Sequence, residues 1–343
     1  MKKIRLGRTN LMVSESSFGA LPIQRISFKD SKILLRKAYN HGINYFDTAR
    51  MYSDSEEKIG NVLSDVREQI IISTKSHAKT GEGLLEHLEI SLAKLKSSYV
   101  DILQIHNPSF LPLMGHESGL YEAVLAAKKS GKARYIGISN HQLKIAKDAV
   151  TSGLYDTVQF PLSSISSEED LQLIPLCKEH DIGLIAMKGL SGGLITNAAS
   201  TFAFLRQYDN LVPIWGIQNE WELDEFISFE NNPPLLDDTM LKVIEKDRKE
   251  LAGSFCRGCG YCMPCPVGIQ IPTAARMSLL LKRSPYEPYM TDEWNEKMHL
   301  INDCIECGQC KSRCPYGLDT PNLLKRMLTE YETFYKTYQE NQL

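Results

Sequence analysis

Short apolar runs alternate with amphipathic stretches through the first 235 residues of this chain. Eight runs have the composition of β-strands, and they read SSFGA, NYFDTA, QIIISTK, VDILQIH, ARYIGIS, DTVQF, IGLIAMK and LVPIWGI. Helical patterns lie between them; residues 30–42, for example, begin on Asp30 as a cap and end on Gly42. Eight strand-helix units of this kind predict an α/β fold, the (β/α)8 or TIM barrel. A doubly wound sheet is the alternative, but no G-x-G-x-x-G follows an early strand.

The cysteines divide the chain into two parts. Residues 1–255 contain one cysteine, Cys177, and residues 256–314 contain eight. Pro233 and Pro234 stop the preceding helix, and a mixed-charge helical connector follows them. We therefore expect a barrel domain at residues 1–235. Residues 236–343 are expected to hold the connector, a small α-helical ferredoxin-like domain and a terminal amphipathic helix, whereas Cys177 is expected to pack in a core.

Composition narrows the class of protein. The formal charge of -3 and the pI near 6.3 give no electrostatic signature for nucleic acid or anionic lipid. The N-terminus lacks the apolar stretch of a signal peptide, and no run approaches the ~20 apolar residues of a membrane span. We expect a cytoplasmic protein that binds neither nucleic acid nor membrane. In that compartment thiols stay reduced, so the cysteines are better suited to metal than to disulfides.

Four polar residues stand where three consecutive predicted strands end. Asp47 ends the second strand, Tyr52 follows in its loop, Lys75 ends the third strand and His106 ends the fourth. Active sites of such barrels are built at the carboxyl ends of the strands. Taken singly, the four have structural explanations as a loop cap, a packing ring, a surface charge and a core histidine. Their common position favours a shared catalytic role.

These residue types suit the reduction of a carbonyl. A carbonyl that receives hydride develops negative charge on oxygen, and an acid must supply a proton. Tyrosine, with an ordinary pKa of about 10, becomes a usable acid when a neighbouring ammonium stabilises its phenolate. Tyr52 is then the proton donor, Lys75 lowers its pKa, and Asp47 keeps Lys75 charged and in place. His106 can orient and polarise the carbonyl as a neutral ring.

The motifs LGRTNLMVS, FDTARMYSDSEEKIG, STK, LQIH, GISN and VQF, in this order, resemble those of the aldo-keto reductase family through nearly all of residues 4–230. The resemblance implies a (β/α)8 barrel that uses a nicotinamide dinucleotide without a Rossmann fold. It also implies that Asp47, Tyr52, Lys75 and His106 form the catalytic tetrad. The nicotinamide carboxamide would be held by three further residues, namely Ser139, Asn140 and Gln159.

The chain departs from the family pattern in two regions. Met187 stands where many members stack a tyrosine on the nicotinamide, and its thioether can still cover a ring. The segment that holds the 2′-phosphate of NADPH in other members has no lysine or arginine here. Gly216, Ile217 and Glu222 occupy those positions, and Glu225 matches the glutamate that contacts adenine. Because a carboxylate repels a phosphate but accepts hydrogen bonds from a free ribose hydroxyl, we expect NADH to be favoured over NADPH.

The eight clustered cysteines form two runs, each closed by a proline. The second run has the C-x2-C-x2-C-x3-C-P spacing of bacterial ferredoxins, and the first has one residue fewer before its last cysteine. In two-cluster ferredoxins the fourth ligand comes from the other run. The expected ligand sets for two 4Fe-4S clusters are therefore Cys256, Cys259, Cys262 with Cys314, and Cys304, Cys307, Cys310 with Cys265. Zinc is the alternative, but each third closely spaced cysteine would then be surplus.

Together the two halves resemble a subset of aldo-keto reductase relatives with a C-terminal ferredoxin-type domain. The first functional hypothesis is hydride transfer between a nicotinamide dinucleotide and a small-molecule carbonyl, with accessory or electron-transfer clusters. In the second, a redox partner such as ferredoxin feeds the clusters, which reduce a barrel-bound substrate, and the nicotinamide site is vestigial. In the third, the barrel is a scaffold for an electron carrier, which the intact tetrad disfavours.

Overall fold

The computed structural model describes residues 1–251, 255–283 and 285–340. The chain groups into two compact units. The first unit comprises Met1–Gly189 and Ala199–Leu241. The second comprises Leu190–Ala198 and Lys242–Leu343, so one short segment from within the barrel sequence belongs to the C-terminal unit.

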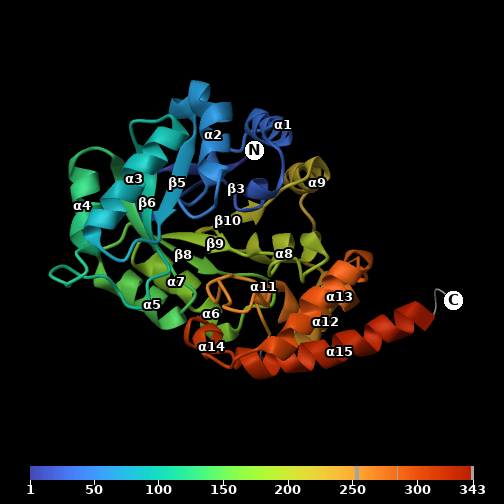
Figure 1. Cartoon of the computed structure of the whole chain (residues 1–343). Coiled ribbons are helices and arrows are strands. Elements are labelled where there is room, and N and C mark those ends of the chain that lie inside the picture. Colours follow the sequence, from blue (N-terminus) through green and yellow to red (C-terminus); the bar gives the residue numbers. More distant parts are fainter. Residues whose placement is uncertain (252–254, 284, 341–343) are drawn as a thin grey trace. The chain divides into compact units, whose positions relative to one another are not determined.

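The first unit contains a closed barrel of eight parallel strands in the order β10-β3-β4-β5-β6-β7-β8-β9 (Figure 1). Each strand falls on one of the eight apolar runs, which confirms the predicted (β/α)8 barrel. The strands are β3 (Ser17–Gly19), β4 (Tyr45–Asp47), β5 (Ile71–Ser76), β6 (Val100–His106), β7 (Ala133–Ser139), β8 (Thr157–Pro161), β9 (Gly183–Met187) and β10 (Leu211–Gly216).

Most residues of the barrel strands are buried, as expected for parallel strands covered by helices. Every residue of β5 and β6 is buried. The strand register then fixes which polar residues share a layer at the carboxyl ends. Asp47 lies opposite Ser73, Lys75 opposite Gln104, and His106 opposite Ser139.

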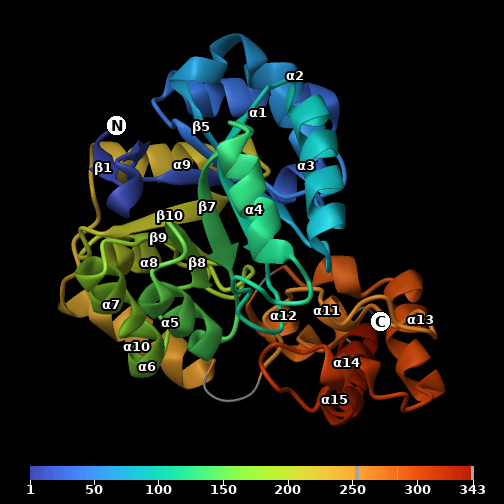
Figure 2. The same cartoon turned by 90° about the vertical axis from the view of Figure 1, so that its left-hand side faces the viewer.

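Helices cover the outside of the barrel, and α1 to α4 follow one another around it (Figure 2). The helices are α1 (Phe28–Asn40), α2 (Ser55–Leu63), α3 (Gly81–Leu95), α4 (Leu120–Lys129), α5 (Leu143–Ser152), α6 (Glu168–Leu171), α7 (Leu173–Glu179), α8 (Ala198–Leu205) and α9 (Glu220–Asn231). Asp30 is not the cap of α1, because the Ser27 side chain accepts a hydrogen bond from the Asp30 N–H at 3.1 Å. Cys177 of α7 is fully buried, as predicted.

An antiparallel pair, β1 (Lys3–Arg5) and β2 (Met12–Ser14), precedes the barrel and was not predicted. Each strand has three residues, which is too short to show an alternating pattern. The described residues also form short 3₁₀ helices, namely η1 (Gly7–Thr9), η2 (Pro22–Arg25), η3 (Ser64–Gln69), η4 (Glu287–Tyr289) and η5 (Leu300–Asp303).

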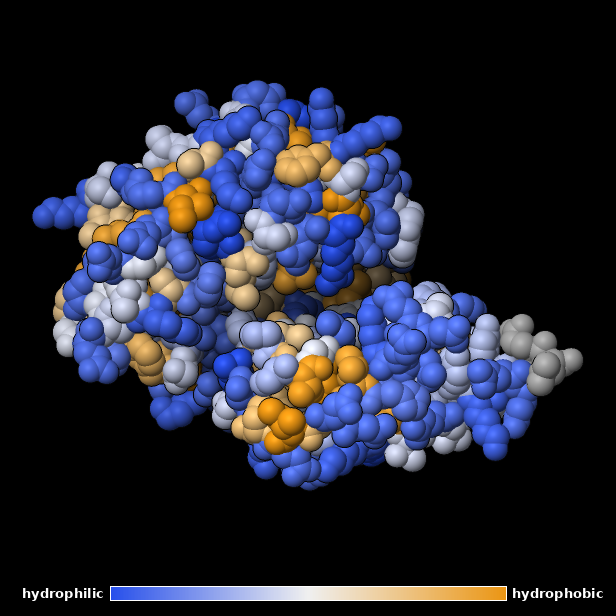
Figure 3. Space-filling model, in the orientation of Figure 1, coloured by the Kyte–Doolittle hydropathy of each residue, from blue (hydrophilic) through white to orange (hydrophobic). Residues whose placement is uncertain are grey.

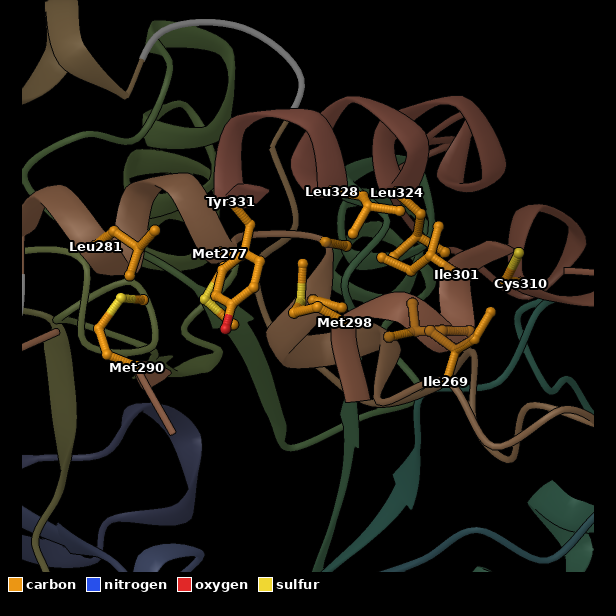
Figure 4. Close-up of a cluster of buried hydrophobic side chains, with 13 residues drawn as sticks. Ile269, Met277, Leu281, Met290, Met298, Ile301, Cys310, Leu324, Leu328 and Tyr331 are labelled. Atoms are coloured by element: carbon orange, nitrogen blue, oxygen red, sulfur yellow. The ribbon is translucent and has the colours of Figure 1, made fainter. Parts of the chain in front are cut away.

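The second unit is helical around its own apolar core. Its helices are α11 (Ile271–Ala274), α12 (Met277–Arg283), α13 (Asp292–His299), α14 (Gln309–Ser312) and α15 (Thr320–Glu340). The connector is helix α10 (Asp238–Glu250), and α15 is the expected terminal helix. Figure 4 shows Leu324, Leu328 and Tyr331 of α15 pointing into the core, with Cys310 at one end of the cluster.

The face seen in Figure 3 is largely hydrophilic, with separate patches of hydrophobic residues. Among the described residues, no helix combines the length and the apolar character needed to cross a bilayer.

Candidate functional site

The structure brings Asp47, Tyr52, Lys75 and His106 together at one end of the barrel. The Lys75 Nζ lies 2.5 Å from the Asp47 Oδ2 and also donates to the Thr48 carbonyl at 2.8 Å. The same ammonium lies 5.3 Å from the centre of the Tyr52 ring. The rings of Tyr52 and His106 meet edge to face, with centroids 5.9 Å apart. The ammonium and the imidazole thus both lie next to the phenol ring.

Burial and charge set the protonation of two of these groups. Desolvation lowers the pKa of Lys75, and the Asp47 carboxylate opposes that shift. Desolvation also holds the pKa of His106 well below its ordinary value, and the charge on Lys75 adds to the shift. His106 is therefore neutral at pH 7, so its ring can donate or accept a hydrogen bond without adding a positive charge.

A buried amide, Gln104, supports the Asp47 carboxylate. Its Nε2 lies 3.3 Å from Asp47 Oδ1, 2.7 Å from Ser73 Oγ and 2.7 Å from Gln159 Oε1. The Gln159 Nε2 in turn donates to Asp47 Oδ2 at 3.4 Å. These contacts hold both oxygens of the carboxylate in place, and a fixed carboxylate holds the ammonium in one place.

The residues expected to hold a nicotinamide lie at or near the ends of neighbouring strands. Their side chains differ in the hydrogen bonds that they already make within the protein. The Ser139 hydroxyl is buried and has no hydrogen-bond partner among the described residues, so it can serve a bound carboxamide. The Asn140 side chain donates to the Pro108 carbonyl at 2.8 Å and accepts from the Gln142 N–H at 2.8 Å. Gln159 is bound to Gln104 and Asp47. Of the three residues, Ser139 is therefore the best placed to form a hydrogen bond with a carboxamide.

The remaining two expected cofactor contacts lie on β9 and α9. Met187 ends β9 and is partly exposed while it packs against the barrel core. At the start of α9, the Glu222 carboxylate accepts hydrogen bonds from the backbone of Gln218 and Asn219, at 2.8 and 2.9 Å. Burial raises the pKa of Glu225, and the neighbouring Glu222 raises it further. Two carboxylates therefore lie close to each other on the first turns of α9.

The eight clustered cysteines line two cavities in the second unit. Cavity A is lined by Cys256, Cys259, Cys262 and Cys314, the first of the two expected ligand sets. Cavity B is lined by the second set together with Cys262, and its cysteines are Cys262, Cys265, Cys304, Cys307 and Cys310. Among the residues that the structure describes, no three His, Cys, Asp or Glu side chains converge on a site for a single metal ion.

The donor chemistry of both cavities fits iron-sulfur clusters, which are held by four thiolates each. Burial raises the pKa of the Cys262 thiol to about 12. Because a bound metal deprotonates a coordinating thiol, iron would offset the cost of this buried thiolate. Gly258, Gly260 and Gly308 have positive φ angles of 60°, 83° and 72°, and such turns let the backbone wrap a cluster.

Comparison with known families decides the identity of the barrel. The model of the aldo/keto reductase family matches residues 15–209, more than half of the chain. The chain belongs to the aldo/keto reductase family. A second family model, the 4Fe-4S dicluster domain, matches residues 255–319, which include all eight clustered cysteines. This aldo/keto reductase therefore carries a C-terminal iron-sulfur domain.

Its relatives match the barrel part. It is 28% identical over 210 residues to the uncharacterised oxidoreductase YqkF of Bacillus subtilis, covering 57% of this chain and 67% of that protein. It is 32% identical over 210 residues to L-galactose dehydrogenase of Arabidopsis thaliana, covering 56% of this chain and 66% of that protein. The chain thus spans about two thirds of the length of these relatives.

A solved aldo-keto reductase of Bacillus halodurans, AKR11C1 in its holo form, has the same fold. The TM-score is 0.64 at 20% identity, and the alignment covers 72% of this chain and 96% of that one.

Sequence reasoning missed several residues of the aldo/keto reductase site. Gln104 lies in the LQIH motif but was not singled out, because its role depends on contacts with three other strands. Glu56 was also missed; it is buried, accepts from the Thr74 hydroxyl at 2.7 Å and pairs with Arg50. A charged residue within the apolar face of α2 was the available signal for Glu56.

Proposed function

We propose that this protein transfers hydride reversibly between a nicotinamide dinucleotide and a small-molecule carbonyl or alcohol, with Tyr52 as the proton donor. The observation that carries the proposal is the proximity of the Lys75 ammonium and the His106 ring to the Tyr52 ring. The nicotinamide would supply the hydride, and the reduction is balanced by one proton from the protein. Carbonyl plus hydride plus proton gives the alcohol.

In this proposal the chain's own residues bind, orient and protonate the substrate. The Tyr52 hydroxyl donates its proton to the carbonyl oxygen, and the Lys75 charge stabilises the phenolate that remains. Asp47, held by Gln104 and Gln159, keeps Lys75 in place. Neutral His106 donates a hydrogen bond to the same oxygen and so favours one orientation of the carbonyl. Ser139, Asn140 and Gln159 would contact the carboxamide, and Met187 would cover the nicotinamide ring.

We propose NADH as the preferred cofactor. The carboxylates of Glu222 and Glu225 on α9 support a free ribose hydroxyl over a phosphate. In the structure one lysine from another helix, Lys37 of α1, contacts α9, and the sequence did not predict this contact. Its ammonium is already bound by Asp224 at 2.8 Å and Glu220 at 3.2 Å, so this lysine does not reverse the expected preference.

We propose that the two cavities hold two 4Fe-4S clusters that exchange single electrons with a protein carrier such as a ferredoxin. Cys307 and Ile305 of cavity B are exposed, Ile305 by 63%. A cluster at an exposed rim suits electron exchange with a docked carrier.

Isotope transfer tests the proposed reaction. Anaerobically purified protein is incubated with NADH deuterated at C4, each stereoisomer in turn, and with a panel of aldehydes and ketones. We expect one isomer to deliver one deuterium to the carbinol carbon of the product alcohol. Fully loaded protein that reduces none of the panel and binds no nicotinamide would overturn the proposal.

The same experiment distinguishes the second candidate, ferredoxin-linked reduction with a vestigial nicotinamide site. The observation in its favour is that Asn140 and Gln159 already have protein partners, which leaves fewer groups for a carboxamide. Product formed with reduced ferredoxin, without deuterium from NADH, would support that candidate. Bleaching of the cluster absorbance by NADH alone would instead show that the two halves exchange electrons.

A further inference from the structure

Arg276, between α11 and α12, lies directly on the turn that carries Cys256 and Cys259. A Cβ atom added at Gly258 would lie 3.0 Å from the Arg276 Cζ and 3.1 Å from its Nη1. Gly258 also donates its N–H to the Cys256 sulfur at 3.4 Å, from a left-handed conformation with φ of 60°. Glycine at position 258 therefore allows the guanidinium to approach the backbone beside a cysteine of cavity A.

The other side of the same guanidinium holds the segment Leu190–Ala198. Arg276 Nη1 donates to the Gly192 carbonyl at 2.7 Å. Arg283, at the end of α12, donates to the Leu194 carbonyl at 2.7 Å. This segment follows Met187 and β9 directly in the sequence, yet it groups with the C-terminal unit. Arg276 thus joins the turn of cavity A to the segment that continues from β9.

Cavity A also differs from cavity B in the charges around it. Arg257 lines cavity A, and its guanidinium carbon lies 4.4 Å from the centre of the Tyr316 ring. Among the lining residues of cavity B the charged one is Glu306, which pairs with the exposed Lys325 at 2.7 Å. A cluster in cavity A would therefore have two arginines nearby, whereas a cluster in cavity B would have a carboxylate and its lysine partner.

We propose that Arg276 sets the reduction potential of the cluster in cavity A and links its redox state to the position of segment 190–198. This inference rests on the proposed iron-sulfur clusters. One-electron reduction, from the 2+ to the 1+ core, adds one negative charge and neither forms nor breaks a bond. A guanidinium beside the cluster stabilises the reduced form and so raises the potential. By linkage, reduction strengthens the hold of the same guanidinium on the segment.

A redox titration with Arg276→Gln tests the first half. The full-length protein is purified anaerobically and titrated with dithionite, without nicotinamide or carbonyl, while the reduced clusters are followed by electron paramagnetic resonance. We expect one of the two reduction waves to become at least tenfold less favourable, a shift of about -59 mV for one electron. Lys282→Gln, which removes an exposed positive charge from the following helix α12, is the matched control and should leave both waves in place.

Hydrogen exchange tests the second half. In the parent protein the amides of residues 190–198 should exchange more slowly after reduction, and in Arg276→Gln the difference should vanish. Arg276→Lys keeps the charge and should shift the reduction wave less than Arg276→Gln does. If Arg276→Gln takes up no iron, the titration is made with Arg276→Lys instead.

Unshifted waves in an iron-loaded Arg276→Gln, or equal exchange in both redox states of the parent, would overturn the inference. A parent protein without cubane clusters would instead overturn the proposed function, so the two failures are distinguishable by iron and sulfide analysis.

Discussion

Asp47 and Lys75 form an ion pair whose side chains are almost fully buried. Each charge compensates the desolvation of the other, so removing one partner leaves an uncompensated buried charge. We predict that Lys75→Met lowers the unfolding free energy of the barrel by about 3–5 kcal/mol and abolishes carbonyl reduction. Urea unfolding followed by tryptophan fluorescence measures the first effect.

The double variant Asp47→Asn, Lys75→Met is the matched control for this prediction. It removes both charges and should recover part of the lost stability while staying inactive. A double variant that is less stable than Lys75→Met alone would show that the pair is not the source of the effect.

His106 makes the stability of the barrel depend on pH. Its pKa in the folded state lies below the ordinary value of about 6.5, so in the window between the two values the unfolded chain binds more protons. The stabilisation is complete above this window and falls as the pH drops into it, by up to about 1.4 kcal/mol per pH unit. We predict that the urea midpoint of the parent drops more between about pH 7.5 and 5.5 than that of His106→Asn. Parallel curves for the two proteins would contradict the prediction.

At the level of single residues, the sequence predicted the location of side chains whose position follows from the strand that bears them. Asp47 and His106 end their strands and Lys75 is the last residue but one of β5, so their common location follows from the barrel. Gln104 and Arg276 act through contacts with segments distant in sequence, and no local pattern predicts such contacts. The contact of Asn140 with the cofactor stays a prediction, and the bonds of its side chain to Pro108 and Gln142 depend on loop geometry that the sequence does not reveal.

The charges on helix α9 are expected to determine the preference between NADH and NADPH. Glu222 stabilises the start of the helix by accepting two backbone hydrogen bonds. In the proposed binding mode its charge would repel a 2′-phosphate. We predict a lower dissociation constant for NADH than for NADPH. The dissociation constant for NADPH divided by that for NADH should fall by about fivefold in Glu222→Gln, because two charges at 4 Å in water interact by ~1 kcal/mol. Fluorescence titration with both cofactors measures it.

The Gln side chain at position 222 can still accept the two backbone hydrogen bonds, so the variant changes charge and keeps the helix start. Glu220→Gln, in the same turn, is the comparison and should change the ratio less, because Lys37 already pairs with Glu220. A clear preference of the parent for NADPH would contradict the assignment.

The elements of the barrel were predictable because each strand is a short, continuous apolar run between helical patterns. The start of α1 was predicted at Asp30 and lies at Ser27, since both residues are good caps and the chain geometry selects between them. The β1–β2 pair was not predictable, because strands of three residues show no period.

For the whole molecule, the two units should respond differently to loss of iron. Cys310 belongs to the core of the second unit together with Leu324 and Ile301 (Figure 4). Four more cysteines of the two cavities pack against this core, namely Cys256, Cys262, Cys265 and Cys304. Parent protein should contain about eight iron and eight sulfide per chain, the content of two 4Fe-4S clusters, and no zinc. Iron chelation under reducing conditions should unfold this unit and leave the barrel transition unchanged.

Circular dichroism and iron analysis on matched variants check this prediction. Cys310→Ser should lower the iron content, whereas Cys177→Ser should keep it, because Cys177 is buried in the barrel unit. Equal loss of iron in both variants, or zinc in place of iron, would contradict the assignment.

The spacing of the cysteines predicted that the chain changes character near residue 256, and a 4Fe-4S dicluster model matches residues 255–319. The division into two proposed ligand sets remains a prediction. The grouping of residues 190–198 with the second unit was not visible. It depends on Arg276 and Arg283, which bind backbone carbonyls, and a carbonyl acceptor leaves no signature in the sequence.

The central claim is that Tyr52 supplies the proton, and the turnover of Tyr52→Phe tests it most directly. Phenylalanine keeps the ring beside Lys75 and His106 and removes only the hydroxyl. We predict that kcat for carbonyl reduction falls by about 10²- to 10⁴-fold while the dissociation constant for NADH stays within about twofold. Turnover at the parent rate would contradict the account.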